Sequence, residues 1–288
     1  MSLFLGCPRW GLKEWVGNFF PPKTQARDFL TLYSRRLNTV EGNTTFYAIP
    51  NLETAARWRA TTPSGFKFCL KFPKVISHER GLRAAEAETR SFLAVLERLG
   101  ERCGPSFLQL PPKFGSQQLA TLTAYLDSLP RDFRYAVEVR HPDFFADPAE
   151  AALDEALRRR GVARVLFDVR GLRQAQAAPD DEAVITAQQR KPDVPVRFTH
   201  TAPFVFVRFI ADPDLTENAP LLDDWAQRVA EWLAADEDVF FFLHSPDDVQ
   251  APRLARDFHA RVAAHHPLPP LPPWGDEAES PVEQPSLF

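Results

Sequence analysis

The stretch Tyr135-Ala136-Val137-Glu138-Val139-Arg140 is typical of one strand of a buried parallel sheet. Its valines alternate with polar residues, which predicts a strand with two different faces. Seven similar short runs occur at residues 3–7, 39–43, 66–72, 107–110, 163–169, 204–209 and 239–244. Eight such runs, separated by longer segments, indicate repeated βα units around a parallel sheet.

The segments between the expected strands show helical periodicity at residues 24–37, 54–60, 86–103, 117–129, 148–160, 221–235 and 249–265. The gap at 170–203 is polar and rich in Gln, Asp and Pro, so we expect a long irregular loop there. This order predicts an α/β fold, a single (β/α)8 TIM barrel spanning residues 1–266. A doubly wound sheet is the alternative, but no GxGxxG or GxxxxGKT follows any expected strand.

Charge and composition exclude several classes of protein. The 288 residues include 34 Lys plus Arg and 38 Asp plus Glu, and 44% are hydrophobic, which is typical of a folded chain. Residues 267–288 carry the whole net charge of −4, so the barrel is neutral and an extended basic track for nucleic acid is not expected. No apolar run reaches membrane-spanning length and no secretion signal is visible, so we expect a cytoplasmic protein with three reduced cysteines.

Polar residues cluster near the carboxyl ends of the expected strands. Because strand residues alternate between the barrel interior and the helices, Val137 and Val139 should face outward, which turns Glu138 and Arg140 inward. In the second strand, the same rule turns Glu41 and Asn43 inward. In each of the six other strands, it turns one polar residue or cysteine inward. These inward residues are Cys7, Lys71, Gln109, Asp168, Arg208 and His244. Active sites of TIM barrels lie at this end, so we expect a functional mouth.

The residue types at this mouth predict the recognition of an anion. Lys71, Arg140 and Arg208 are candidate cationic donors to a phosphate or carboxylate. Glu41, Glu138 and Asp168 are candidate general acids or bases. His141, three positions after Glu138, is a further catalytic candidate. The remaining candidates for substrate binding are Arg9, Trp10, Asn43, Tyr47, Gln109 and His244.

Two alternatives stay open for these charged residues. Glu138 and Arg140 alone would be explained as well by a structural ion pair. The acidic residues would also suit a divalent metal, which the sequence does not favour because no motif such as HExxH is present. No cofactor is identified.

Several sequence blocks together resemble the YecE-like family, which is known as domain of unknown function 72. They are Gly6-Cys-Pro-Arg-Trp10, Asn38-Thr-Val-Glu-Gly-Asn-Thr-Thr-Phe-Tyr47, Phe107-Leu-Gln-Leu-Pro-Pro112 and Glu138-Val-Arg-His-Pro142. The resemblance implies a TIM barrel and supplies no reaction. Arg208-Phe-Ile-Ala211 departs from the family's Arg-Leu-His-Gly, and Leu243-His244 departs from a pair of Asn, so the mouth is altered at strands seven and eight.

Residues 267–288 are predicted to be a tail outside the barrel. The segment Pro267-Leu-Pro-Pro-Leu-Pro-Pro-Trp274 predicts a stiff polyproline II spacer, and the acidic residues that follow it predict disorder. The last five residues resemble the pentapeptide, Gln-Leu-Ser/Asp-Leu-Phe, with which bacterial repair proteins bind the DNA sliding clamp. Gln284, Ser286, Leu287 and Phe288 fit it and Pro285 does not.

Two enzyme hypotheses follow. The first is a hydrolase of phosphate esters that is brought to DNA by the sliding clamp. The second is an enzyme that acts on a phosphorylated or carboxylated metabolite at the same mouth. A binding module without catalytic activity is the third alternative.

Overall fold

A computed structural model describes residues 2–274 of the chain. Eight parallel strands form a ring in the order β3-β2-β1-β8-β7-β6-β5-β4. The strands are β1 (Leu3–Cys7), β2 (Thr39–Gly42), β3 (Lys67–Leu70), β4 (Ser106–Gln109), β5 (Tyr135–Glu138), β6 (Ala163–Asp168), β7 (Phe204–Ile210) and β8 (Asp238–His244). Bridges between Phe68 and Cys103 and between Lys71 and Phe107 join the β3 and β4 edges. The predicted TIM barrel is therefore confirmed.

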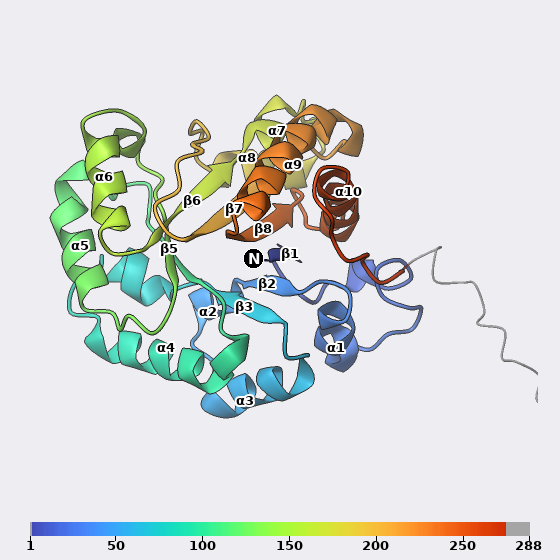
Figure 1. Ribbon diagram of the computed structural model, residues 1–288, viewed down its shortest axis with the longest axis horizontal. Coiled ribbons are helices and arrows are strands. Elements are labelled where there is room, and N and C mark those ends of the chain that lie inside the picture. Colours follow the sequence, from blue (N-terminus) through green and yellow to red (C-terminus); the bar gives the residue numbers. More distant parts are fainter. Residues whose placement is uncertain (1, 275–288) are drawn as a thin grey trace, which may run out of the picture.

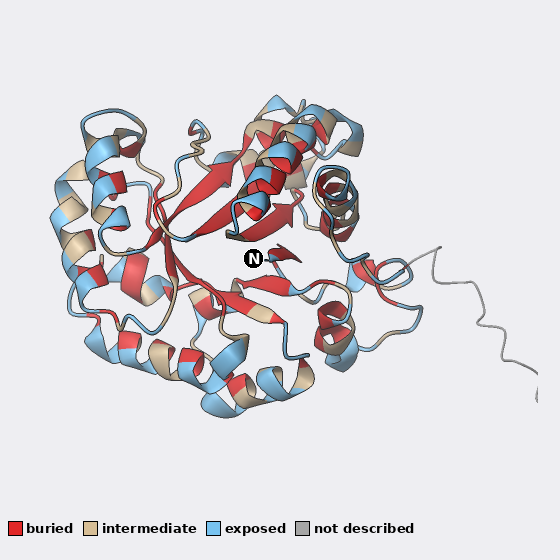
Figure 2. Cartoon of the chain, viewed as in Figure 1, coloured by how far each residue is buried: buried red, intermediate tan, exposed pale blue. Residues whose placement is uncertain are grey.

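Helices surround this ring, with their buried faces toward it and their exposed faces away from it (Figures 1 and 2). They are α1 (Phe29–Ser34), α2 (Thr44–Tyr47), α3 (Leu52–Thr61), α4 (Glu86–Leu99), α5 (Leu119–Asp127), α6 (Ala149–Arg158), α7 (Arg170–Gln174), α8 (Glu182–Arg190), α9 (Ala219–Ala234) and α10 (Ala251–Ala263). In α4, the buried residues Phe92, Val95 and Leu99 recur every three or four positions and face the sheet. The helix ends where Gly100 adopts a φ of 55°, a conformation that glycine tolerates. None of the helices in residues 2–274 is long and apolar enough to cross a membrane.

Aromatic side chains fill the interior of the barrel. Phe4, Phe107, Phe206 and Phe240 belong to one buried cluster inside the ring. Cys7 belongs to the other cluster, between strands and helices, so the prediction that it faces inward is wrong. By alternation with Phe4, Gly6 takes the inward position instead, and a Cβ there would lie 2.4 Å from the carbonyl oxygen of Thr39, so the position requires glycine.

The gap after β6 is more ordered than the sequence predicts. Residues 170–203 contain α7 and α8 before the chain becomes irregular. Asp181 caps α8, because its side chain accepts a hydrogen bond from the backbone N–H of Val184, and Val184 and Ala187 are buried beneath the helix. The prediction of one long irregular loop is therefore wrong for this part of the gap.

The proline-rich segment at residues 267–274, here called the strap, lies against the barrel. Its Trp274 is only 3% exposed, with its ring 5.2 Å from that of Phe19 and the guanidinium of Arg256 4.0 Å from its ring centroid. His259 donates a hydrogen bond of 3.0 Å to the carbonyl oxygen of Pro269. The prediction of a free spacer from residue 267 is therefore wrong up to Trp274, and residues 275–288 lie outside the described residues.

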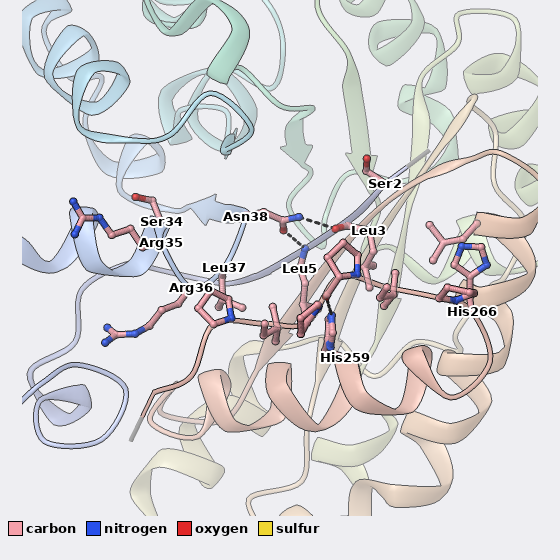
Figure 3. A pocket seen from close by; sticks show the side chains of 17 residues that line it. Ser2, Leu3, Leu5, Ser34, Arg35, Arg36, Leu37, Asn38, His259 and His266 are labelled. Carbon is pink, nitrogen blue, oxygen red and sulfur yellow. Dashed lines mark hydrogen bonds between the residues drawn. The ribbon is translucent and has the colours of Figure 1, made fainter. Parts of the chain in front are cut away.

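The strap covers a part of the barrel that the short α1 leaves uncovered. Leu268 and Leu271 pack against the same cluster as the outward side chains of β1, Leu3 and Leu5. A pocket of about 420 Å³ remains between the strap, β1 and the α1–β2 connection (Figure 3). Burial of these apolar side chains explains why a proline-rich segment stays on the barrel.

Candidate functional site

Arg208 lies at the centre of the mouth, between two buried carboxylates from two other strands of the barrel. From β7, its Nε and Nη2 each donate a hydrogen bond of 2.7 Å to Glu41 on β2. Its Nη1 donates to Glu138 on β5. All three side chains are buried. The mouth therefore has a floor made of a closed ion-pair network.

The charges of this floor are fixed near neutral pH. Burial by itself would raise the pKa of Glu138, but the positive charges of Arg208 and Arg140 outweigh it and hold the pKa at about 2. Burial opposes the ionisation of Glu41 in the same way, and Arg208 and His244 keep its pKa well below the ordinary value. Both carboxylates are thus anions in the folded protein.

A second row of polar side chains continues from the floor toward β3. Arg140 donates from Nε to Glu138 at 2.7 Å and from Nη2 to Oε1 of Gln109 at 2.8 Å. Lys71, directly after β3, donates to the same Gln109 oxygen at 2.8 Å. Its Nζ also lies 4.1 Å from the ring centroid of Phe46. Gln109 thus links the two cationic side chains without neutralising either.

Lys71 has a strongly lowered pKa. Burial lowers its pKa to about 7, and the positive charge of Arg208 contributes to the shift. Within residues 2–274, no carboxylate forms an ion pair with Lys71. A substantial fraction of Lys71 is therefore neutral at pH 7.

Two further predicted residues hold Glu41 in place. Asn43 donates from Nδ2 to Oε1 of Glu41 at 2.7 Å and to the carbonyl oxygen of Pro8 at 3.1 Å. His244, at the end of β8, has its Nε2 3.1 Å from Oε2 of Glu41. Because burial lowers the pKa of His244 and a carboxylate only accepts, we assign a neutral ring that donates from Nε2. Both residues therefore support the floor.

Above the floor lies a pocket of about 850 Å³, which α8 helps to enclose. Arg190 and Lys191, at the end of α8, line it together with Lys71, Arg140 and Arg208. Burial and the positive charge of Arg208 lower the pKa of Lys191. Neither residue is predicted as part of the site from the sequence, because both lie in residues 170–203, where a loop is expected. The cap at Asp181, followed by the apolar spacing of Val184 and Ala187, is the signal that would have revealed α8.

The other predicted residues are peripheral. Arg9 lines the pocket but pairs with Asp248 at 3.0 Å, and Tyr47 lies on the rim, 82% exposed. Trp10 packs edge-on against Trp58, with ring centroids 5.1 Å apart, and borders a smaller pocket of about 310 Å³. His141 accepts from the backbone N–H of Asp143 and does not line the main pocket.

Asp168 is placed outside the mouth, so the prediction that it faces inward is wrong. It accepts hydrogen bonds from Arg170 and from the indole N–H of Trp225 on α9 at 2.7 Å. The inward positions of β6 belong to Val165 and Phe167. Asp168 therefore attaches β6 to the helical layer and is not a member of the site.

The donor set of the mouth offers little to a metal ion. Within residues 2–274, no group of three His, Cys, Asp or Glu side chains is arranged to hold one. Glu41 and Glu138 are both bound by Arg208, whose charge would repel a cation placed between them.

Fold and site together define a TIM-barrel protein with a charged pocket at the carboxyl end of its strands. The family described as "Protein of unknown function DUF72" matches residues 4–277, and the chain belongs to this family. The chain is 42% identical over 253 residues to UPF0759 protein YecE of Escherichia coli K12, which covers 88% of this chain and 89% of that one. It is 26% identical over 155 residues to UPF0759 protein YunF of Bacillus subtilis 168, covering 51% of this chain and 53% of that one.

Two crystal structures of DUF72 family proteins share the fold. The protein from Enterococcus faecalis V583 has a TM-score of 0.68 at 18% identity, covering 94% of this chain and 98% of that one. The protein from Thermotoga maritima MSB8 has a TM-score of 0.65 at 20% identity, covering 91% and 99%. Identities this low support the barrel and carry no function.

Proposed function

We propose that the mouth binds a small molecule with a phosphate or carboxylate group and acts on it as an enzyme. The observation that supports this is a local excess of positive charge in a barrel that is neutral overall. The pocket is lined by the seven basic residues Arg9, Lys71, Lys74, Arg140, Arg190, Lys191 and Arg208. The acidic residues at the pocket and its floor are Glu41, Glu138, Glu182 and Asp248.

The ion pairs narrow down which cations are available to a ligand. Arg208 is held by two carboxylates, Arg9 by Asp248, and Lys74 lies 3.5 Å from Glu79. The pocket cations that remain available to a ligand are Lys71, Arg140, Arg190 and Lys191. Arg140 can use its Nη1, because its Nε and Nη2 bind Glu138 and Gln109. The anionic group should therefore bind between the end of α8 and the β3–β5 side of the mouth, and not on Arg208 as expected from the sequence.

The same contacts favour Lys71 as the group that exchanges a proton with the ligand. Glu41 and Glu138 are fixed as anions by Arg208, which leaves them poorly suited to take up a proton or hold a metal near neutral pH. Lys71, with a pKa of about 7, is suited to proton transfer at neutral pH. We therefore place a metabolite-sized substrate ahead of a DNA phosphodiester in this pocket.

Replacing Lys191 by Gln should weaken the binding of inorganic phosphate about 10- to 100-fold, because one charge-assisted hydrogen bond is lost. Isothermal titration calorimetry of the full chain with phosphate and with malonate measures this effect. Lys23→Gln is the matched control, since Lys23 lies outside the pocket and should bind like the wild type. Absence of heat with both anions in the wild type, or equal affinities in Lys191→Gln and Lys23→Gln, would refute the anion site.

We also propose that Gln284, Ser286, Leu287 and Phe288 bind the bacterial sliding clamp. The support is the sequence resemblance alone, because these residues lie outside the described part of the chain. No residue of the strap lines the mouth, so a partner on this end of the chain is compatible with an accessible pocket.

Replacing both Leu287 and Phe288 by Ala should weaken clamp binding about 10-fold or more, because apolar anchors dominate such interfaces. Surface plasmon resonance of the full chain over immobilised clamp provides the measurement. Val282→Ala, outside the pentapeptide, is the control and should bind normally. If wild type and double variant give the same response, the clamp proposal fails.

A further inference from the structure

We propose that Lys71 is a nucleophile that forms an imine with a carbonyl group of the ligand, which makes the substrate an anionic aldehyde or ketone. The inference rests on the proposed function for the anionic part of the substrate only. The surroundings of Lys71 support the carbonyl part independently.

Two uncharged side chains orient Lys71, and neither of them neutralises its positive charge. Gln109 accepts its hydrogen bond at 2.8 Å, and the ring of Phe46 covers another side, with its centroid 4.1 Å from Nζ. The remaining side is open to the pocket, which Lys71 lines. A lysine used only for structure would normally be paired with a carboxylate when buried, and the nearby Glu41 and Glu138 are bound by Arg208 instead.

The charges around Lys71 favour its neutral, nucleophilic form. Arg140 after β5, Arg208 on β7 and Lys74 in the segment after β3 are cations that face the same pocket. Burial, together with the positive charges of Arg140 and Lys74, lowers the pKa of His78 at residues 75–79 to about 4, so its ring is neutral. A buried lysine beside other cations is one of the recognised ways to activate an amine for imine formation.

The step balances without any external oxidant or reductant. The lone pair of Nζ forms a bond to the carbonyl carbon, and the carbonyl π electrons move to oxygen to give a carbinolamine. The carbinolamine C–O bond then breaks. Both amine hydrogens leave with that oxygen as water, and a C=N double bond remains.

The positions of the other cations define the substrate class. Lys191 and Arg190 border the same pocket from α8, so they suit the phosphate or carboxylate of a molecule whose carbonyl reaches Lys71. The anionic group of the substrate thus lies beside Arg190 and Lys191 at the end of α8. Its carbonyl group lies beside Lys71, directly after β3.

Trapping with borohydride tests the inference. The full chain is incubated with glycolaldehyde phosphate or with uncharged glycolaldehyde, reduced with borohydride, and analysed by peptide mass mapping. We expect Lys71 to be modified at least about 10-fold faster by the phosphorylated aldehyde, and Lys191→Gln to abolish that preference. Between pH 6 and 8 the rate at Lys71 should rise about tenfold and then level off, whereas the rate for the free amino acid derivative Nα-acetyllysine, with an ordinary pKa of about 10.4, should continue to rise.

Outcomes for the imine and for the anion site are separable. If Lys71 in the wild type is modified no faster than Lys23, the imine is refuted, while phosphate calorimetry still decides the anion site. If Lys71 reacts selectively but equally fast with both aldehydes, the imine stands and the anion site fails. Lys71→Met, whose apolar chain suits the buried position, should melt like the wild type and yield no modified peptide at residue 71.

Discussion

Replacing Arg208 by Met should lower the free energy of unfolding by about 3 to 5 kcal/mol, which is among the largest effects of a single substitution in this chain. The reason is the pair of carboxylates that Arg208 neutralises. Among the described residues 2–274, Glu41 would keep Asn43 and His244 as its hydrogen-bonding side chains, and Glu138 would keep Arg140. Urea unfolding followed by tryptophan fluorescence measures the loss.

Arg158→Met is the matched control for this experiment. Arg158 is half exposed on α6 and pairs with Glu155 at 3.2 Å, so its loss should change the free energy of unfolding by less than about 1 kcal/mol. Adding Glu41→Gln and Glu138→Gln to Arg208→Met should recover part of the stability, because neutral amides do not need a counter-charge. Equal losses for Arg208→Met and Arg158→Met would contradict the closed network.

Lowering the pH should destabilise the wild type and should stabilise the Arg208→Met variant. In the wild type, the pKa values of Glu41 and Glu138 are depressed, so their stabilising contribution is complete above the ordinary value of 4.5 and is lost as the pH falls through their folded-state pKa values, which for Glu138 is about 2. In Arg208→Met, a buried Glu41 without its main partner should have a raised pKa. The variant should therefore gain stability on acidification from pH 8 to about 5.

The barrel could be predicted from the sequence because its strands are short, apolar and separated by periodic helices. The orientation of β6 could not. Val165, Leu166 and Phe167 are apolar on both faces of that strand, so hydrophobicity does not show which residues point inward. Tertiary contacts reveal its orientation, including the hydrogen bond of Asp168 with Trp225, 57 residues later in the chain.

The candidate site could be predicted where each strand carries its own polar residue. Glu41, Gln109, Glu138, Arg208 and His244 meet as the alternation of inward and outward residues predicts. Lys191 could not be placed in this way, because a helix inserted after β6 brings it over the mouth. The balance of charges also depends on geometry, since the sequence does not show that Arg208 binds both glutamates and leaves Lys71 without one.

Removing the strap should have an effect comparable to that of Arg208→Met. A chain that ends at residue 266 exposes the outer face of β1 and loses Trp274, whose substitution by Ala should alone lower the free energy of unfolding by about 3 kcal/mol. A chain that ends at residue 274 keeps these contacts and should unfold at nearly the same urea concentration as the full chain. Comparing the two truncated proteins separates the strap from the acidic residues that follow it.

The contacts of Trp274 explain why a segment of eight residues, five of them proline, has such an effect. Its ring lies between Phe19 and Arg256, and its carbonyl oxygen accepts a hydrogen bond of 2.7 Å from Arg256. Proline restricts the unfolded chain, so ordering the strap loses less conformational entropy than ordering an average segment. Equal stability of chains ending at 266 and 274 would show that these contacts contribute nothing and that the barrel ends at residue 266, as composition alone suggests.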